Sequence, residues 1–366
     1  MSRQIEAFCD YSTSYTESRS RFLDAANARN ARLTTVPHPL KGPEGESLFM
    51  DFACLGPKDA ASAIVVVSGT HGIEGFCGAG VQFNLLNDDR LLERLKDFHV
   101  ILLHGHNPHG FAWLRRTNED NIDLNRNYVD FSEPQEMNEA YQNVRELILP
   151  EQFDDNAEAK LAAWIEENGL SEYQKVVMGG QRIDPQGIFY GGTQSVWSNQ
   201  QVHQLLPLMT RHQQSVGLID LHTGLGPHGH GDLIHAYPKG STEYDNLRAW
   251  YGKDMIAINA GEYGDVVSAV PRGPIVSSLD MVLPDQESYG FVIEFGTVEF
   301  DRVIRALRAD NWLHVHGDLS SSEGVEMKQE MRRCFYSDTQ DWWQKIWDRS
   351  AWSIEKMADG LAANVS

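Results

Sequence analysis

The sequence predicts one α/β domain, built on a mixed, largely parallel, twisted sheet with helices on both faces. Short unbroken apolar runs, rich in β-branched residues, are typical of strands buried on both sides. Segments with apolar residues at helical spacing separate these runs. Polar residues follow several runs directly, at the position where open α/β sheets bind ligands. The 366 residues can bury a large core, and we find no internal repeat or low-complexity linker that would divide it.

The first 60 residues are expected to form a helix and a hairpin. Residues 12–31 are polar with a few apolar side chains on one side, which favours a short helix with a solvated face. Residues 32–37 and 47–55 read as strands. The glycines and prolines of residues 39–45 predict the loop between them.

The next stretch, AIVVVSGTHGIEGFCGAG, predicts a strand, a loop and a helix in that order. Residues 63–67 are an apolar run, Ser68-Gly69-Thr70 ends it, and helical spacing begins at residue 78. His71 and Glu74 fall in the loop with H-x-x-E spacing, and such a pair can bind Zn²⁺. Solvated surface turns contain the same spacing, so its meaning depends on the residues that follow.

Three later runs also have the character of buried strands. Residues 98–104 form the first, residues 215–222 form the second and end on His222, and residues 291–296 form the third. The third run carries a single carboxylate, Glu294, within an otherwise apolar stretch. Ionisable residues therefore accompany the ends of three predicted strands.

The remaining segments predict loops and helices. Residues 105–110 read as a wet loop, which explains their histidines without a metal. Residues 133–175 have helical spacing and are expected to form helices on the outside of the sheet. The same spacing in residues 301–313 and 338–357 predicts two terminal helices that cover the sheet.

Composition limits the partners. There are 31 Lys and Arg against 52 Asp and Glu, a net charge of −21, which disfavours nucleic acid and anionic membranes as partners. The four cysteines form no C-x-x-C pair and read as free thiols. No apolar segment has the length of a membrane span, and the N-terminus lacks a signal-like apolar region. We therefore expect a cytoplasmic, bacterial protein, and the sequence makes no prediction of its oligomeric state.

Five short motifs occur in an order that resembles the zinc metallocarboxypeptidases of the carboxypeptidase A type. They are HGIE at 71–74, RRT at 115–117, DLNRN at 123–127, DLHTG at 220–224 and VIEFG at 292–296. Each motif is weak alone, but the ordered set is specific. The match covers about residues 63–300 and implies a carboxypeptidase-like, phosphorylase/hydrolase-type fold. Within the superfamily, the chain is most similar to a bacterial branch known mainly as a domain of unknown function.

The resemblance assigns one Zn²⁺ ion to His71, Glu74 and His222. Three protein ligands leave a fourth position for water, which is the open arrangement of a catalytic zinc, and the ion would lower the pKa of that water to about 7. Asp123 is expected to accept the remaining N–H of His71.

The same resemblance, supported by chemistry, assigns the remaining roles. Glu294 is expected to act as the general base, although a solvated glutamate at a sheet edge is the simpler interpretation without the other motifs. Arg115 is placed to stabilise an oxyanion. Asn125 and Arg126 are expected to clamp a substrate carboxylate, because a guanidinium suits bidentate contact.

The chain departs from the family pattern in two places. The family has a tyrosine shortly before the base, whereas here Tyr263 lies further upstream and cannot take that role. The segment between Arg126 and His222 is long, so an insertion of about residues 130–212 is expected to reshape the mouth of the site. Shortly after His222 come three further candidate ligands for a second metal: His228, His230 and Asp232. We interpret them instead as part of a glycine-rich mobile loop.

We therefore expect a zinc-dependent hydrolase that cleaves an amide or peptide bond next to a free carboxylate, most simply a metallocarboxypeptidase. Its substrate would be a small peptide or an N-acyl amino acid. The alternative is an amidohydrolase of the aspartoacylase or succinylglutamate desuccinylase type, which shares the D-L-N-R motif, and Asn127 tilts the choice towards the peptidase. A non-catalytic metal-binding protein is the third possibility, and the presence of the whole residue set argues against it. The expected organisation is one domain over 1–366, with a core at about 63–300 and C-terminal helices at 301–366.

Overall fold

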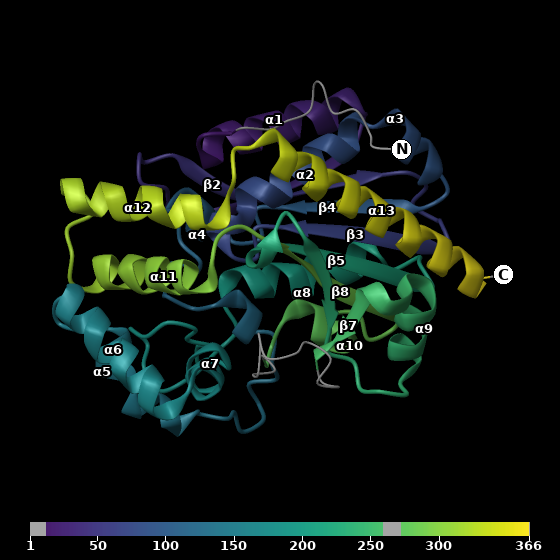
Figure 1. Cartoon of the computed structure of the whole chain (residues 1–366). Helices are drawn as coiled ribbons and strands as arrows, with labels where there is room; N and C mark the ends of the chain where they lie inside the picture. The colour runs from purple at the N-terminus through teal and green to yellow at the C-terminus, as the bar shows by residue number, and fades with distance from the viewer. Residues whose placement is uncertain (1–11, 259–271, 366) are drawn as a thin grey trace.

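The computed structural model describes residues 12–258 and 272–365, and their strands form one eight-stranded sheet in the order β1-β2-β4-β3-β5-β8-β6-β7 (Figure 1). The strands are β1 Arg32–Lys41, β2 Ser47–Leu55, β3 Ser62–Ser68, β4 His99–His104, β5 Ser215–His228, β6 Gly231–His235, β7 Met255–Ala257 and β8 Glu287–Gly296. The central strands β4, β3, β5 and β8 are parallel to one another. The predicted mixed, largely parallel sheet is confirmed.

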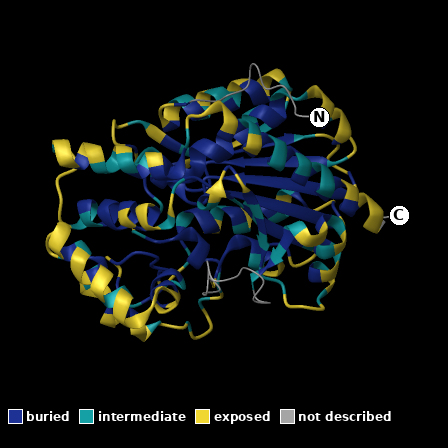
Figure 2. Cartoon of the chain, in the orientation of Figure 1, coloured by how far each residue is buried: buried dark blue, intermediate teal, exposed yellow. Residues whose placement is uncertain are grey.

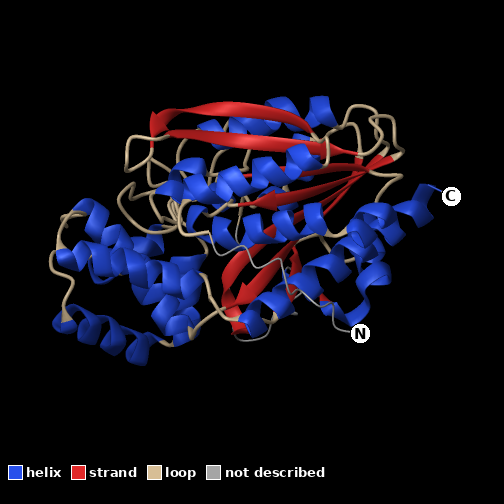
Figure 3. Cartoon of the chain, turned by 90° about the horizontal axis from the view of Figure 1, so that it is seen from above, coloured by secondary structure: helices blue, strands red, loops and turns tan. Residues whose placement is uncertain are grey.

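Helices cover both faces of this twisted sheet, as predicted (Figure 3). Within the described ranges the α-helices are α1 Tyr15–Ala28, α2 Gly75–Asn87, α3 Asp89–Arg94, α4 Pro108–Ala112, α5 Arg145–Ile148, α6 Asp155–Asn168, α7 Leu170–Met178, α8 Trp197–Met209, α9 Thr242–Tyr251, α10 Leu279–Val282, α11 Phe300–Val315, α12 Ser322–Phe335 and α13 Gln340–Val365. One apolar core lies between the sheet and α1, α2 and α13, and a second lies between the sheet and α8 and α10.

The alternation of side chains along β3 explains the two cores. Ile64 and Val66 belong to the first core, whereas Ala63, Val65 and Val67 belong to the second, because successive side chains point to opposite faces of a strand. All five are buried, and the strands in the middle of the sheet are dark blue in Figure 2. Each buried valine or isoleucine contributes about 1.5–3 kcal/mol. The strand is therefore fixed in the middle of the sheet, with its carboxyl end free to carry a site.

Strand β1 is longer than predicted. It runs to Lys41 and contains Pro37 and Pro39, which we had read as its end and the start of the loop. β1 is the outermost strand of the sheet, where a proline, which has no N–H, costs no ladder bond if it faces outward. The pairing with β2 shifts register between Pro37 and Lys41.

The predicted insertion contains two different structures. Helices α5, α6 and α7 form a lobe beside the sheet and next to α11 (Figure 1). The buried guanidinium of Arg308 in α11 joins this lobe to the rest by donating to the carbonyls of Leu147 and Ile148 and to Glu158. Helix α8, in contrast, covers a face of the sheet through Val202 and Leu206. Residues 130–212 therefore comprise a lobe beside the sheet and a helix that packs on the sheet.

The C-terminal region has one more helix than predicted. Helix α12 packs against α11, and α13 lies over α2 and the sheet. The sequence of α12, SEGVEMKQEMRRCF, is polar overall, but Met327, Met331 and Cys334 lie at helical spacing, a signal that our prediction overlooked. Ser321 caps its first turn by accepting from the N–H of Gly324.

The segment that we had read as a mobile loop after His222 is ordered. β5 continues to His228, a turn follows at Gly229 with φ of 73°, and β6 then pairs antiparallel with β8. His228 and His230 are exposed, and His230 lies 3.1 Å from Asp232. Residues 222–235 thus form two strands that pair with β8, where we had expected a mobile loop.

Three further observations concern the whole chain. Cys54, Cys77 and Cys334 are buried free thiols, as predicted, and Cys9 lies outside the described residues. Tyr263 also lies outside them. Among the described helices, none combines the length and the apolar character that a membrane span requires.

Candidate metal centre

The carboxyl ends of β3 and β5 bring His71, Glu74 and His222 together. β3 and β5 are adjacent and parallel, with Ser68 paired to Leu221. His71 precedes the short 3-10 helix Gly72–Glu74, which leads into α2. A side chain at Gly72 would place its Cβ 2.0 Å from the carbonyl carbon of Gly110, so glycine lets this turn lie against the neighbouring loop.

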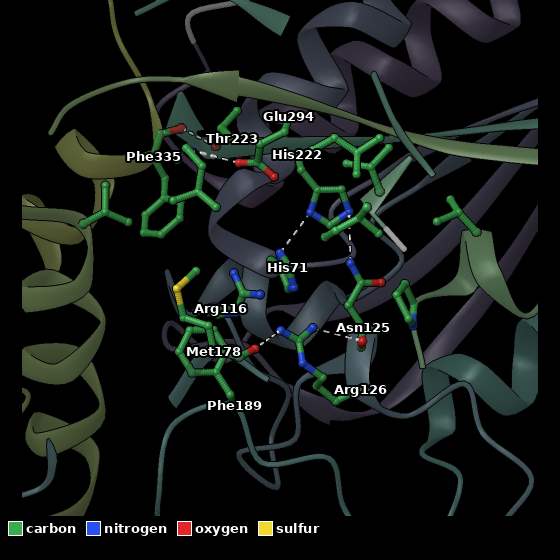
Figure 4. Close-up of a pocket in the computed structure, with 18 of the residues that line it drawn as sticks. His71, Arg116, Asn125, Arg126, Met178, Phe189, His222, Thr223, Glu294 and Phe335 are labelled. Atoms are coloured by element: carbon green, nitrogen blue, oxygen red, sulfur yellow. Dashed lines mark hydrogen bonds between the residues drawn. The ribbon is translucent and has the colours of Figure 1, made fainter. Parts of the chain in front are cut away.

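The ligating atoms of the three residues converge. Nδ1 of His71 lies 2.8 Å from Oε1 of Glu74, and Nδ1 of His222 lies 2.9 Å from Oε2 of the same carboxylate. The two Nδ1 atoms are 3.0 Å apart (Figure 4). All three side chains are at most 5% exposed. In the part of the chain that the structure describes, this is the group of His, Cys, Asp and Glu whose ligating atoms are close enough to share a metal ion.

The opposite nitrogens of both imidazoles contact carboxylates. Nε2 of His71 lies 3.1 Å from Asp123, and Nε2 of His222 lies 2.8 Å from Asp220. Ionised carboxylates only accept, so each Nε2 carries a proton, and Nδ1 is the atom of each ring that remains to bind a metal ion. Two imidazole nitrogens and a carboxylate therefore face one point. The donor set of two imidazole nitrogens and a carboxylate fits zinc.

The electrostatics of the buried groups favour a positive charge at the same point. Burial opposes ionisation of Glu74, but His71 and His222 hold its pKa well below the usual range. Burial likewise disfavours charged His222, yet Asp220 and Glu74 raise its pKa well above the usual value. Burial would raise the pKa of Asp123 too, but Arg116 and His71 lower it well below normal. The carboxylates of Glu74, Asp123 and Asp220 thus surround the two imidazoles and favour a positive charge between them.

Asp220 is a residue that sequence reasoning missed. It lies two positions before His222 on β5, so both side chains point to the same face, and this spacing could have identified it. A buried network holds it: Thr70 donates to Asp220 at 2.8 Å and lies 3.0 Å from His106, which lies 2.8 Å from the hydroxyl of Tyr128.

His106, in the loop after β4, is not solvated, contrary to our expectation. His106 is fully buried, and burial lowers its pKa to about 4, so it is neutral and serves as a hydrogen-bonding element. Asn107 caps α4 by accepting from the N–H of Gly110.

Glu294 faces the same cavity from β8. It is paired in register with His222 on β5, and its Oε1 accepts the N–H of Leu225 at 3.1 Å. Burial, with a further contribution from Glu74, raises its pKa to about 8. The predicted base therefore lies beside the candidate metal ligands, on the neighbouring strand.

The structure does not bring Arg115 into the cavity. Its guanidinium lies 3.3 Å from Asp310 in α11 and donates to Asn121. Arg116 lines the cavity instead, 3.0 Å from Asp123 and 3.5 Å from Glu74. The two consecutive side chains point in different directions, and because the segment lies outside regular secondary structure no periodicity indicates which of them faces the cavity.

Asn125 and Arg126 both line the cavity. Nδ2 of Asn125 lies 3.3 Å from Nε2 of His222. Arg126 donates to the carbonyls of Asn125 and Met178, and its Nε is buried without a hydrogen-bond partner among the described residues. Burial lowers its pKa to about 10, which still leaves it charged at neutral pH.

The cavity around these residues is partly open to solvent, and its empty space, the open part included, is about 970 Å³. Its walls are mainly apolar, and no tyrosine lines it among the described residues. His228 and His230 line a separate surface hollow with Lys345 and Trp352, away from the candidate metal ligands.

The fold is similar to that of solved structures related to carboxypeptidases. The bovine thrombin-activatable fibrinolysis inhibitor in complex with tick carboxypeptidase inhibitor matches with a TM-score of 0.51 and 12% identity over 96% of this chain and 97% of that chain. A second structure of thrombin-activatable fibrinolysis inhibitor gives the same score and identity over 96% and 74%. Carboxypeptidase A from Helicoverpa armigera matches with a TM-score of 0.45 and 13% identity over 87% and 73%. These likenesses concern the fold.

The chain itself belongs to a family described as a protein of unknown function (DUF2817), whose model matches residues 11–349. A search of curated proteins gave no match. The predicted resemblance to the carboxypeptidase fold and to a family of unknown function is thereby confirmed.

Proposed function

We propose that this protein is a zinc-dependent hydrolase that cleaves an amide or peptide bond next to a free carboxylate, with a metallocarboxypeptidase as the leading class. The observation that carries the proposal is the convergence of the two Nδ1 atoms and the Glu74 carboxylate beside Glu294. A carboxylate with a raised pKa next to a metal-binding group is the combination that a hydrolase needs.

His71, Glu74 and His222 would hold the ion, which supplies a water of lowered pKa and polarises the scissile carbonyl. Glu294 accepts a proton from the attacking water. As the C–N bond breaks, it delivers this proton to the amine, and the products are a carboxylic acid and a free amine. Arg116 is placed to stabilise the negative charge that develops on the carbonyl oxygen.

Arg126 and Asn125 would hold the substrate carboxylate. The guanidinium is buried yet charged, its Nε has no partner among the described residues, and it lines the cavity (Figure 4). A charge-assisted hydrogen bond to a carboxylate would satisfy this group.

An N-acyl amino acid amidohydrolase is the second candidate, because the same residues would bind an amino acid that carries an acyl group. The apolar walls of the cavity favour it, since a simple acyl group needs no hydrogen-bonding partners. The leaving amino acid and its carboxylate would occupy the same place in both reactions.

The proposal is tested with zinc-loaded protein on a panel of blocked dipeptides and N-acyl amino acids, each as the free acid and as the amide. We expect turnover of the acids, loss of turnover after chelation, and its recovery when zinc is returned. Absence of turnover across the panel with bound zinc would contradict the proposal.

Variants of Arg126 test whether this residue binds the carboxylate of the substrate. Arg126→Ala should raise KM more than it lowers kcat, because a carboxylate grip acts alike in ground and transition states. Arg126→Lys should be nearly as impaired, since it keeps the charge but loses the planar fork. The measurement is the preference for acid over amide, and an unchanged preference in both variants would remove Arg126 from this role.

A further inference from the structure

We infer that the cavity contains an acyl-side subsite for an apolar group, so that the substrate carries a hydrocarbon or aromatic group on the acyl side of the scissile amide. This inference rests on the proposed function and specifies its substrate class. The residues that form the subsite, called the α11 wall, are Val303, Ile304, Leu307 and Phe335.

The α11 wall lies opposite the proposed carboxylate anchor. In Figure 4, Phe335 lies on one side of His71 and His222, and Asn125 lies on the other. A substrate held by its carboxylate at Asn125 and Arg126, with its amide at the candidate metal ligands, directs its acyl half towards Phe335. A separate apolar wall, called the β8 wall, would then face the side chain of the leaving amino acid: Ile234, Val276 and Val292.

Backbone geometry holds the α11 wall close to the reacting atoms. α11 begins four residues after the end of β8, the strand that carries Glu294. Gly224, two residues after His222, has φ of 129°, and a Cβ there would lie 2.9 Å from the ring of Phe335. The hydroxyl of Thr223 donates to the carbonyl of Phe335 at 2.7 Å. Glycine and this hydrogen bond let the aromatic ring pack directly against the strand that carries His222.

The chemistry of the wall selects an apolar ligand. All four side chains of the α11 wall are hydrocarbon, and all four are buried. The nearby polar groups are engaged: Thr223 donates to Phe335, and Arg116 contacts Asp123 and Glu74. A polar acyl group placed here would lose its water without gaining a partner, which is costly.

Two kinds of substrate supply this chemistry. One is an N-acyl amino acid with a hydrocarbon or aromatic acyl group, and the other is a dipeptide whose first residue has an apolar side chain. Burial of each methylene is expected to raise kcat/KM roughly three- to fourfold, from about 0.8 kcal/mol per buried CH₂.

The test uses the zinc-loaded protein and compares acetyl, butanoyl and hexanoyl derivatives of one amino acid, with blocked dipeptides that begin with alanine or leucine as the second arm. Ile304→Ala truncates the α11 wall, and Ile234→Ala is the matched control on the β8 wall.

We expect kcat/KM to rise along the acyl series in the wild type and in Ile234→Ala. In Ile304→Ala, hexanoyl substrates should lose roughly tenfold more than acetyl substrates. If kcat/KM increases more from the alanine to the leucine dipeptide than it does along the acyl series, the subsite is assigned to peptides.

Binding of butanoate and hexanoate, measured by calorimetry, decides the subsite even if no substrate is hydrolysed. Tighter binding of hexanoate that is reduced in Ile304→Ala and retained in Ile234→Ala supports the inference. Equal binding of the two acids, or a loss confined to Ile234→Ala, overturns it. Absence of turnover combined with hexanoate binding at the α11 wall would refute the proposed function and leave the apolar subsite standing.

Discussion

The chemistry of the candidate centre depends on which nitrogen of each imidazole is free. Asp123 and Asp220 hold the two Nε2 atoms, so both Nδ1 atoms point to the carboxylate of Glu74. A carboxylate that accepts the outer N–H fixes the tautomer and orients the ring. The resemblance predicted the role of Asp123, which belongs to the D-x-N-R-N motif. It did not predict the role of Asp220, although strand periodicity places this residue beside His222.

Glu294→Gln is the first prediction at this scale. The amide cannot accept the proton of the attacking water, so kcat should fall about 10²–10⁴-fold. Its bound zinc should equal that of the wild type, because Glu294 is not among the three candidate ligands. Metal analysis and kcat on the same preparation check both points, and full activity in Glu294→Gln would require another base.

Arg116 and Arg115 form a matched pair. Arg116→Ala should lower kcat by about 10²–10³-fold at saturating zinc, because the oxyanion loses a donor. Arg115→Ala should keep kcat and lower the free energy of unfolding by about 1–3 kcal/mol, because Asp310 loses a buried partner. Kinetics and urea unfolding of both variants separate the roles, and a kinetic defect confined to Arg115→Ala would restore the assignment made from the motif.

At the scale of elements, adjacent parallel strands create the site. β3, β5 and β8 lie side by side, and their carboxyl ends carry His71, His222 and Glu294. Apolar runs predicted these strands because each is buried on both faces. Helix α12 was missed although Met327, Met331 and Cys334 lie at helical spacing. The direction of Arg116 could not be predicted because its segment has no regular periodicity.

Strand β4 yields a prediction on pH and stability. His104 is buried at its end, stacked on Phe22 with ring centroids 4.4 Å apart, and burial lowers its pKa from 6.5 to about 4. Between these values the unfolded chain binds a proton that the folded state does not, so lowering the pH favours unfolding. His104 should therefore cost about 2 kcal/mol of stability between pH 7 and pH 5.

The comparison of wild type with His104→Gln isolates this contribution. Urea unfolding should show that the free energy of unfolding falls less from pH 7 to pH 5 in the variant than in the wild type. This comparison holds even if the variant is less stable at pH 7. The same loss in both proteins would mean that His104 does not titrate as its burial implies.

For the whole molecule, one sheet carries the site, and additional helices shape its surroundings. The sequence predicted the mixed sheet, the two helical layers and the residues that converge on the candidate metal. It did not predict the α11 wall, because Val303 and Phe335 meet only through the packing of α11, α12 and β5. The single-domain organisation and the cytoplasmic location stay predictions.

The central claim is that Nδ1 of His71, Nδ1 of His222 and the carboxylate of Glu74 bind one metal ion. Anomalous diffraction at the zinc absorption edge, from crystals of protein purified with zinc, tests it directly. We predict one strong peak with all three ligating atoms at about 2.0–2.2 Å, and its loss in His222→Ala. A zinc-loaded protein whose anomalous peak lies elsewhere, or in contact with the Nε2 atoms, would contradict the claim.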